Sequence, residues 1–330
     1  MTQPDAIESL ASALIADLTA VVDQLEAAIR DAMPGWFHLT PPARVIRLRE
    51  LQTTLLAMIN DADAIAANRV VATMQTAYET GAWAAAIGAG ATAGFSGIDV
   101  DAVTHLATDT MSNLLQATKG MREDVKQVIR ELTRDQVRTK LYVGQTAIQA
   151  GQDLAKTMAD RGITAVVYSN GAHVSLAQYA EMVIRTKTAE AYQEGGLNQG
   201  EQLGIDWWEV MDGPGCGWTS HDDPQKADGM IVPLASARAH PLSHPNCRRS
   251  TTPRPDIASL SDAQDATPTP TTSTTRVWDA AVRAQAQANR AVATSTTPAR
   301  ASAGLDTAAG VIPNTPAGRR FAATLAKHTA

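Results

Sequence analysis

Two cysteines and two histidines stand at the ends of one loop-like segment that is rich in Gly, Pro and Asp. The pattern Cys216-x4-His221 opens the segment and His244-x2-Cys247 closes it. Thiolates and imidazoles are the ligands that structural zinc prefers, usually four in a tetrahedron. The segment has too few apolar residues for a large core, so a metal would supply the stability that it lacks. We therefore predict one structural zinc ion held by these four side chains.

The same four residues allow two other interpretations. The spacing matches no common zinc-finger pattern, so both cysteines can be buried thiols while the histidines cap turns. Cys216 and Cys247 can instead form a disulfide, although two distant cysteines suit a reducing cytosol better than a disulfide scaffold. The sequence leaves these alternatives open.

Four arginines follow or flank the second Cys/His pair: Arg238, Arg248, Arg249 and Arg254. Guanidinium groups present fixed donor forks that match carboxylates and phosphates. The four form a locally basic stretch in a chain whose formal net charge is −6. We interpret them as candidate interaction residues, and the alternative is a solvated surface that pairs with acidic residues of the same chain.

Other groups with catalytic potential are weaker. His221-Asp222-Asp223 could serve as a metal or general-base cluster, but acidic residues beside Pro224 more often form a turn. The glycines from Gly88 to Gly94 follow a predicted helix and lack the Lys-Ser/Thr pair of a phosphate loop. With no convincing catalytic constellation, we expect a protein that is not an enzyme. Trp207, Trp208 and Trp218 are expected to cover the core of the small module, and the alternative is that they bind a ligand.

The elements that precede this segment are predicted to be helical. Apolar residues recur every three or four positions, and Thr40 followed by Pro41 and Pro42 is typical of a helix start. Residues 1–160 therefore form a mostly helical region. Its predicted helices cover residues 1–33, 45 to about 78, about 99 to 115 and 122 to about 158, with a Gly- and Ala-rich break over 81–97.

Residues 161–256 are predicted to form a small α+β module. A strand over 164–168, an Asn170-Gly171 turn and a returning strand make a hairpin. A helix through Tyr179 and Ala189 follows, then three glycines and a strand over 206–211. The fold class is therefore α+β, with an elongated and mostly helical N-terminal region.

The last segment, residues 257–330, is predicted to be a low-complexity and mostly disordered tail. Residues 266–275 are almost all Thr, Pro and Ser, which bury too little apolar surface to fold. A short helix over 277–292 is predicted within it. The chain shows no membrane span and no leader peptide, so we expect synthesis in the cytoplasm and no membrane partner.

At His244-Pro-Asn-Cys-Arg248 the chain resembles the phage Mu F-like minor head proteins, a family of portal-associated head-morphogenesis proteins. Asp228-Gly229 precedes this motif, as a DG pair does in that family. The Arg185-Thr186 pair on a helix, the preceding Asn-Gly hairpin and the following Trp-Glu-Val strand are also similar. The resemblance covers about residues 160–256. It departs at Arg249, where many members have a further cysteine.

The resemblance implies a minor capsid protein inside the phage head, bound near the portal, that aids assembly or DNA delivery. Its implied partners are the portal protein, with the scaffold, the major capsid protein and packaged DNA as further candidates. One alternative is an internal head protein that contacts DNA and is ejected with the genome. A capsid maturation protease and a toxin-type transferase are less favoured, because the tail is too short and polar for a fused enzyme.

Overall fold

The computed structural model describes residues 3–32, 35, 38–91, 97–137, 163–168 and 170–267. The part of the predicted fourth helix between 138 and 158, the predicted helix over 277–292 and the predicted flexible tail beyond residue 267 lie outside these residues.

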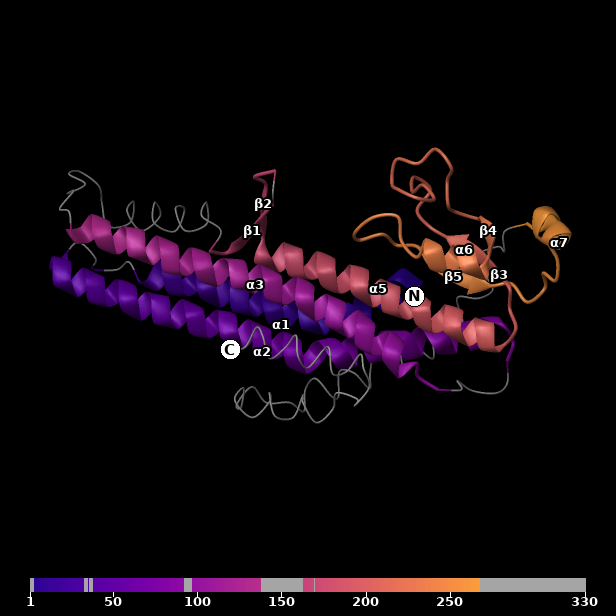
Figure 1. Cartoon of the computed structure of the whole chain (residues 1–330), viewed down its shortest axis with the longest axis horizontal. Helices are drawn as coiled ribbons and strands as arrows, with labels where there is room; N and C mark the ends of the chain where they lie inside the picture. Colours follow the sequence, from indigo (N-terminus) through magenta and orange to yellow (C-terminus); the bar gives the residue numbers. More distant parts are fainter. Residues whose placement is uncertain are drawn as a thin grey trace.

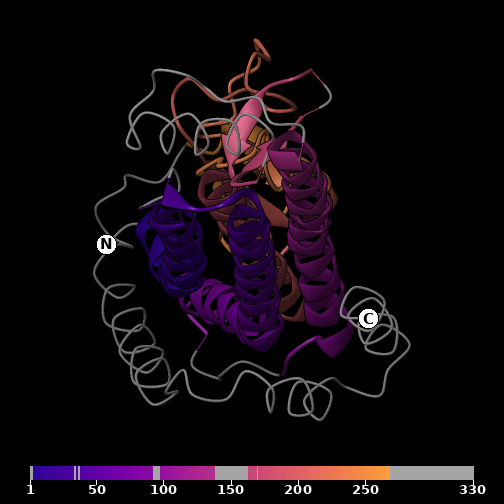
Figure 2. The ribbon, with the colours of Figure 1, turned by 90° about the vertical axis from the view of Figure 1, so that its left-hand side faces the viewer.

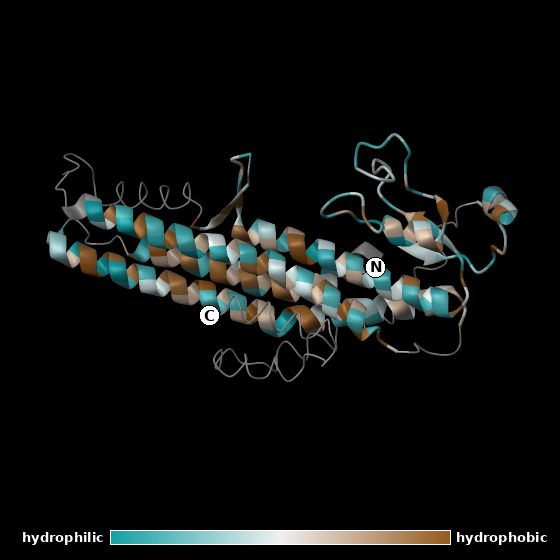
Figure 3. Cartoon of the chain, in the orientation of Figure 1, coloured by the Kyte–Doolittle hydropathy of each residue, from teal (hydrophilic) through white to brown (hydrophobic). Residues whose placement is uncertain are grey.

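Four long helices lie side by side along the long axis of the molecule (Figures 1 and 2). They are α1 (Gln3–Asp31), α2 (Pro41–Gly88), α3 (Val100–Val137) and α5 (Leu176–Gln202). Apolar and polar residues alternate along the helices (Figure 3), and in α1 and α3 the apolar residues gather on one face, as in helices that pack on one side. The shared core includes Leu14, Leu25, Leu55, Ile59, Met74, Met111, Leu115 and Ile184.

The predicted helix starts are confirmed. Thr40 is the N-cap of α2 and prolines occupy its first turn, where a missing N–H has no cost. Asp99 caps α3, because its carboxylate accepts a hydrogen bond from the Ala102 amide at 3.0 Å. The elongated helical region expected from the sequence is therefore present.

The predicted break over 81–97 begins too early, and the predicted joint between the third and fourth helices was wrong. Helix α2 continues through Gly81 to Gly88, and the third and fourth predicted helices form one continuous α3. The stretch of α3 that was predicted to be a joint instead contacts α2, because Thr118 and Arg122 both bind Asp63. Interhelical contacts therefore keep this stretch helical.

The glycines predicted to follow the helix of the module lie inside α5. A Cβ atom at Gly195 would overlap the carbonyl oxygen of Tyr78, and one at Gly81 would overlap that of Tyr192. Helices α2 and α5 thus approach each other at reciprocal glycines. Gly200 has the same role toward the sheet, since a Cβ there would overlap the Trp208 ring.

The predicted hairpin is confirmed. Strand β1 (Ala165–Val167) pairs antiparallel with β2 (His173–Ser175), with Val166 opposite Val174. Gly171 has a φ of 81°, and the Asn170 carboxamide accepts a hydrogen bond from the Ala172 amide, as a tight turn requires. The hairpin leads directly into α5.

A second small sheet lies at one end of the bundle (Figure 1). Strand β3 (Trp207–Met211), which lies within the strand predicted over 206–211, is between β4 (Ile231–Pro233) and β5 (Ser250–Pro253) and antiparallel to both. Helix α6 (Leu234–Ala239) follows β4, and α7 (Leu260–Asp265) follows the sheet. Trp208 is fully buried in a small core of this unit and Trp218 is nearly so, which confirms the expected role of these two tryptophans.

The fold class predicted from the sequence is confirmed for the described residues. The predicted boundary between residues 160 and 161, however, does not separate two cores. Buried side chains of α5, including Ala180 and Ile184, belong to the same core as α1, α2 and α3. The segment with a core of its own begins near the C-terminal end of α5.

Replacing Gly195 by Ala should destabilise the protein, because the added methyl group must displace the α2 backbone; overpacking of this kind costs about 1–3 kcal/mol. The matched control is Gly120→Ala in α3. A Cβ at Gly120 meets no atom within 4 Å, so this substitution should stabilise the helix by about 0.5–1 kcal/mol. Urea unfolding of the full chain, followed by circular dichroism, measures both. Equal midpoints for the two variants would contradict the close helix contact.

Candidate metal centre

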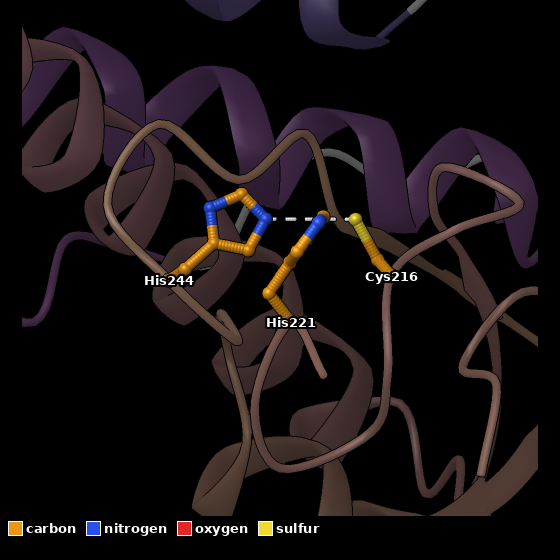
Figure 4. A group of neighbouring side chains, drawn as sticks. All are labelled: Cys216, His221 and His244. Carbon is orange, nitrogen blue, oxygen red and sulfur yellow. Dashed lines mark hydrogen bonds between the residues drawn. The ribbon is translucent and has the colours of Figure 1, made fainter. Parts of the chain in front are cut away.

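Three of the four predicted zinc ligands meet in one place. Cys216 and His221 lie on the loop of residues 212–230 that joins β3 to β4, and His244 lies on the turn before β5 (Figure 4). Their ligand atoms all lie within 4.8 Å of one another. Cys247 lies next to this group, because its sulfur is within 4.8 Å of the Cys216 sulfur. All four predicted ligands therefore converge around the Cys216 thiol.

The residues His244-Pro-Asn-Cys247, here called the HPNC turn, form a tight reversal. The Cys247 amide donates a hydrogen bond to the His244 carbonyl at 3.1 Å, and Asn246 has a φ of 60°. Proline at the second position and a left-handed residue at the third are what a type II turn requires. The Asn246 amide also donates to the Thr186 hydroxyl of α5 at 3.2 Å, which fixes the turn against the bundle.

The imidazole of His244 is oriented on both sides. Its Nδ1 lies 2.8 Å from the Pro245 carbonyl oxygen and its Nε2 lies 3.5 Å from the Cys216 sulfur. If Nδ1 carries the proton and donates it to the carbonyl, Nε2 presents a lone pair to the cluster. The His221 ring stands perpendicular to that of His244, with ring centroids 4.9 Å apart.

Both sulfur atoms are free thiols in the structure. Cys247 is buried, and its sulfur lies 3.7 Å from each carboxylate oxygen of Asp212 and 3.5 Å from the Ser243 hydroxyl. Loss of solvent contact and the neighbouring Asp212 carboxylate raise the pKa of Cys216 to about 11. A thiol with a raised pKa is a poor nucleophile at neutral pH unless a cation stabilises its thiolate.

Asp212 and Arg249 form a buried ion pair beside the cysteines. Both side chains have no exposed surface, and Arg249 Nε lies 2.9 Å from an Asp212 oxygen. The two terminal nitrogens of Arg249 donate hydrogen bonds to the carbonyl oxygens of Trp218, His240 and Gly217. The guanidinium therefore joins the 212–230 loop, the segment before the HPNC turn and β5.

This placement corrects the expectation for Arg249. The sequence predicted a surface interaction residue, but the side chain is fully buried and its donors serve the fold. The physical reason is Asp212, which compensates a buried positive charge, together with the carbonyl groups that accept its other hydrogen bonds.

Arg238, Arg248 and Arg254, the other three predicted interaction residues, do not form one basic surface with Arg249. Arg238 binds Glu194 and Glu201 of α5 at 2.8 and 2.5 Å. Arg254 binds Glu209 and Asp256, and the Asp256 partner raises its pKa further. Arg248 is exposed and forms no ion pair with the described residues. Arg248 is thus the member of this set that is best placed to meet another molecule.

Asp223, the second acidic residue after His221, stabilises a turn, which is one of the two alternatives that the sequence allowed. The Asp223 carboxylate accepts hydrogen bonds from the Thr219 hydroxyl, the Thr219 amide and the Gln225 amide. These bonds, the Thr219 hydroxyl first, lower the pKa of Asp223. The Asp223 carboxylate therefore stabilises the 212–230 loop, and these hydrogen bonds give no support for a role as a general base.

Sequence reasoning missed three residues that build the site: Asp212, Thr186 and Gln193. Gln193 of α5 is buried and donates to the carbonyls of Pro241 and Arg249, on either side of the HPNC turn. An acidic residue directly after a predicted strand was a usable signal for Asp212. Nothing local marks Thr186 or Gln193 as partners of a turn that lies far along the chain.

A family model described as phage minor capsid protein 2 matches residues 18–215, well over half of the chain. The chain belongs to this family. No curated protein and no solved structure matches it. None of the helices that the structure describes combines the length and apolar character of a membrane span.

Membership in the phage minor capsid protein 2 family confirms the coarser expectation of a phage minor capsid protein. The matched region covers most of the bundle, the β1–β2 hairpin and β3, and it ends directly before Cys216. The candidate ligands therefore lie beyond the part of the chain that the family model describes. The finer resemblance to Mu F-like proteins stays a prediction.

Replacing Arg249 by Met should destabilise the protein by about 3–5 kcal/mol, because it leaves the Asp212 carboxylate buried without its partner. Arg238→Met is the matched control. It removes an arginine whose ion pairs are partly exposed, which contribute about 0–1 kcal/mol. Thermal and urea unfolding of the two variants measure the difference. A loss for Arg249→Met no larger than that for Arg238→Met would show that the buried pair does not hold the site together.

Proposed function

We propose that the protein is a structural component of the phage head that docks at the portal from the inside and aids head assembly or DNA delivery. The observation that carries this proposal is the match to the phage minor capsid protein 2 family over residues 18–215. The HPNCR motif and its companions, which resemble Mu F-like proteins, support the portal as the partner.

The geometry supports a structural role. A continuous bundle of four long helices gives a stiff body, and the small sheet with its loops sits at one end of it (Figure 1). The loops that join the strands are fixed by hydrogen bonds to α5 and Arg249, of which those of Gln193 and Arg249 are buried. A compact unit at the end of a stiff rod suits docking to another protein.

A thiol protease has less support. Cys216 and His244 lie close enough to resemble a nucleophile and its base. However, the pKa of Cys216 is raised, where an activated nucleophile needs a lowered one. His244 also lies against His221, which leaves less room for a substrate between the two groups. We therefore propose a protein that is not an enzyme.

Direct contact with packaged DNA also has less support. Phosphate binding needs available cations, and the formal net charge of the chain is −6. Arg238, Arg249 and Arg254 are paired with carboxylates of the chain itself. Binding of the purified protein to duplex DNA that weakens steeply with salt would favour this alternative over the portal.

The proposal predicts a minor component of purified particles. Quantitative mass spectrometry should find the protein in DNA-filled heads at a few copies, far below the major capsid protein. Protease added to intact particles should leave it uncut, and protease added after the heads are opened should degrade it. Absence from particles, a copy number equal to the major capsid protein, or cleavage in intact heads would contradict the proposal.

The proposal also predicts that Arg248 contributes to portal binding. Arg248→Glu should weaken co-purification with the portal protein roughly fivefold, as expected for loss of about 1 kcal/mol from one exposed ion pair. Arg130→Glu is the matched control, because Arg130 is an exposed arginine of α3, and the C-terminal end of α3 lies away from the sheet (Figure 1). Equal binding by both variants would exclude Arg248 from the contact, and no portal binding by the unmodified chain would overturn the portal assignment.

A further inference from the structure

We propose that Cys216, His221, His244 and Cys247 bind one zinc ion in a tetrahedral site that ties the 212–230 loop to the HPNC turn. The inference rests on the positions of these side chains and stands independently of portal docking. It selects one of the three interpretations that the sequence left open.

The separation between the best-placed donors matches a shared zinc ion. With Zn–S of about 2.3 Å and Zn–N of about 2.0–2.1 Å in a tetrahedron, a sulfur and a nitrogen ligand lie about 3.6 Å apart. Cys216 Sγ and His244 Nε2 are 3.5 Å apart. The three side chains are drawn together in Figure 4, and the ligand nitrogen of His221 lies within 4.8 Å of both atoms.

The hydrogen bond at the other ring nitrogen of His244 is also typical of a zinc ligand. Metal-bound histidines usually donate their other ring N–H to a carbonyl or carboxylate, which fixes the tautomer and the ring orientation. Here Nδ1 lies 2.8 Å from the Pro245 carbonyl oxygen, within the same turn. The turn that positions His244 therefore also supplies its orienting partner.

Cys247 completes the ligand set, and Asp212 stays outside it. Two thiolates on one zinc ion lie about 3.8 Å apart, and the two sulfurs already lie within 4.8 Å. The Asp212 oxygens also lie near both cysteines, but one binds Arg249 and the other accepts from the Gly213 amide at 2.7 Å. Asp212 therefore lies beside the ligands and compensates the charge of Arg249.

The charges balance in the loaded site. Zinc binding displaces one proton from each of Cys216 and Cys247 to solvent, and the two thiolates neutralise the divalent ion. The neighbouring Asp212–Arg249 pair is neutral by itself. The partly buried centre thus carries no net charge, which keeps its desolvation cost low.

The 212–230 loop gains stability from such a cross-link. Between β3 and β4 the buried residues are Gly217, Trp218 and Ala227, so the loop contributes little apolar surface to the core. A bound ion joins two points of this loop to the HPNC turn.

The first test measures metal content and thermal stability of the full-length chain, purified from zinc-supplemented cells with reductant and without affinity tags that contain histidine. One zinc per chain is expected, and a chelator should lower its melting temperature. Cys247→Ser and His244→Ala should each lose most of the zinc. The matched control His173→Ala, at an exposed histidine of β2, should keep it.

A second measurement protects the test against variants that fold poorly. Co²⁺ added to the metal-free unmodified chain should give the visible absorption of a tetrahedral thiolate-bound ion, and equimolar Zn²⁺ should abolish it. Absence of both zinc and this signal overturns the proposal. One zinc per chain in the double variant His221→Ala/His244→Ala would also overturn the proposal, because the metal would then be held by Asp212 and the cysteines. If thiol titration of the chain without reductant finds no free cysteine, the two residues form a disulfide instead. None of these readouts involves the portal, so they are separate from the proposed function.

Discussion

The close approach of α2 and α5 is the constraint on which the rest of the structure depends. At Gly81 and Gly195 each helix admits a carbonyl oxygen of the other, which a side chain would exclude. This contact sets the position of α5 along the bundle. Because Thr186, Gln193 and Gly200 of α5 contact the HPNC turn, its flanks and Trp208, the same helix also positions the sheet. Helix α5 therefore belongs to both parts of the molecule, and the bundle carries the candidate metal centre.

The small sheet is stabilised in a different way from the bundle. Its own core is centred on Trp208, and few apolar residues support the long loop after β3. Buried polar groups replace them: Arg249 binds three carbonyl oxygens and Asp212, and Gln193 binds two more carbonyls. A buried ion pair gives little net stability but is costly to leave half-formed. Such a network selects one arrangement of the loops, and the Cys and His side chains converge as a result.

The sequence predicted those features that depend on neighbouring residues. Helical spacing, the Thr40-Pro41-Pro42 start, the Asn170-Gly171 hairpin and the Trp-rich strand are local signals, and each was confirmed. Convergence of the four ligands also followed from short spacings at the ends of one loop. The continuation of α2 and α5 through their glycines was missed, because a glycine that breaks an isolated helix is favourable where another backbone must approach. Arg249 was misplaced for a similar reason, since its partner Asp212 lies on a different element.

The way in which the chain uses its arginines bears on what its surface can bind. Arg122, Arg185, Arg238, Arg249 and Arg254 each pair with a carboxylate of the chain itself. Positive charge in these pairs serves the fold and is compensated before a partner arrives. These five arginines therefore offer little uncompensated positive charge to a phosphate backbone. Recognition of a protein by the shape of a fixed loop unit, helped by an exposed cation such as Arg248, requires no such excess of positive charge. The internal pairing of these arginines is one reason to propose a protein partner before packaged DNA.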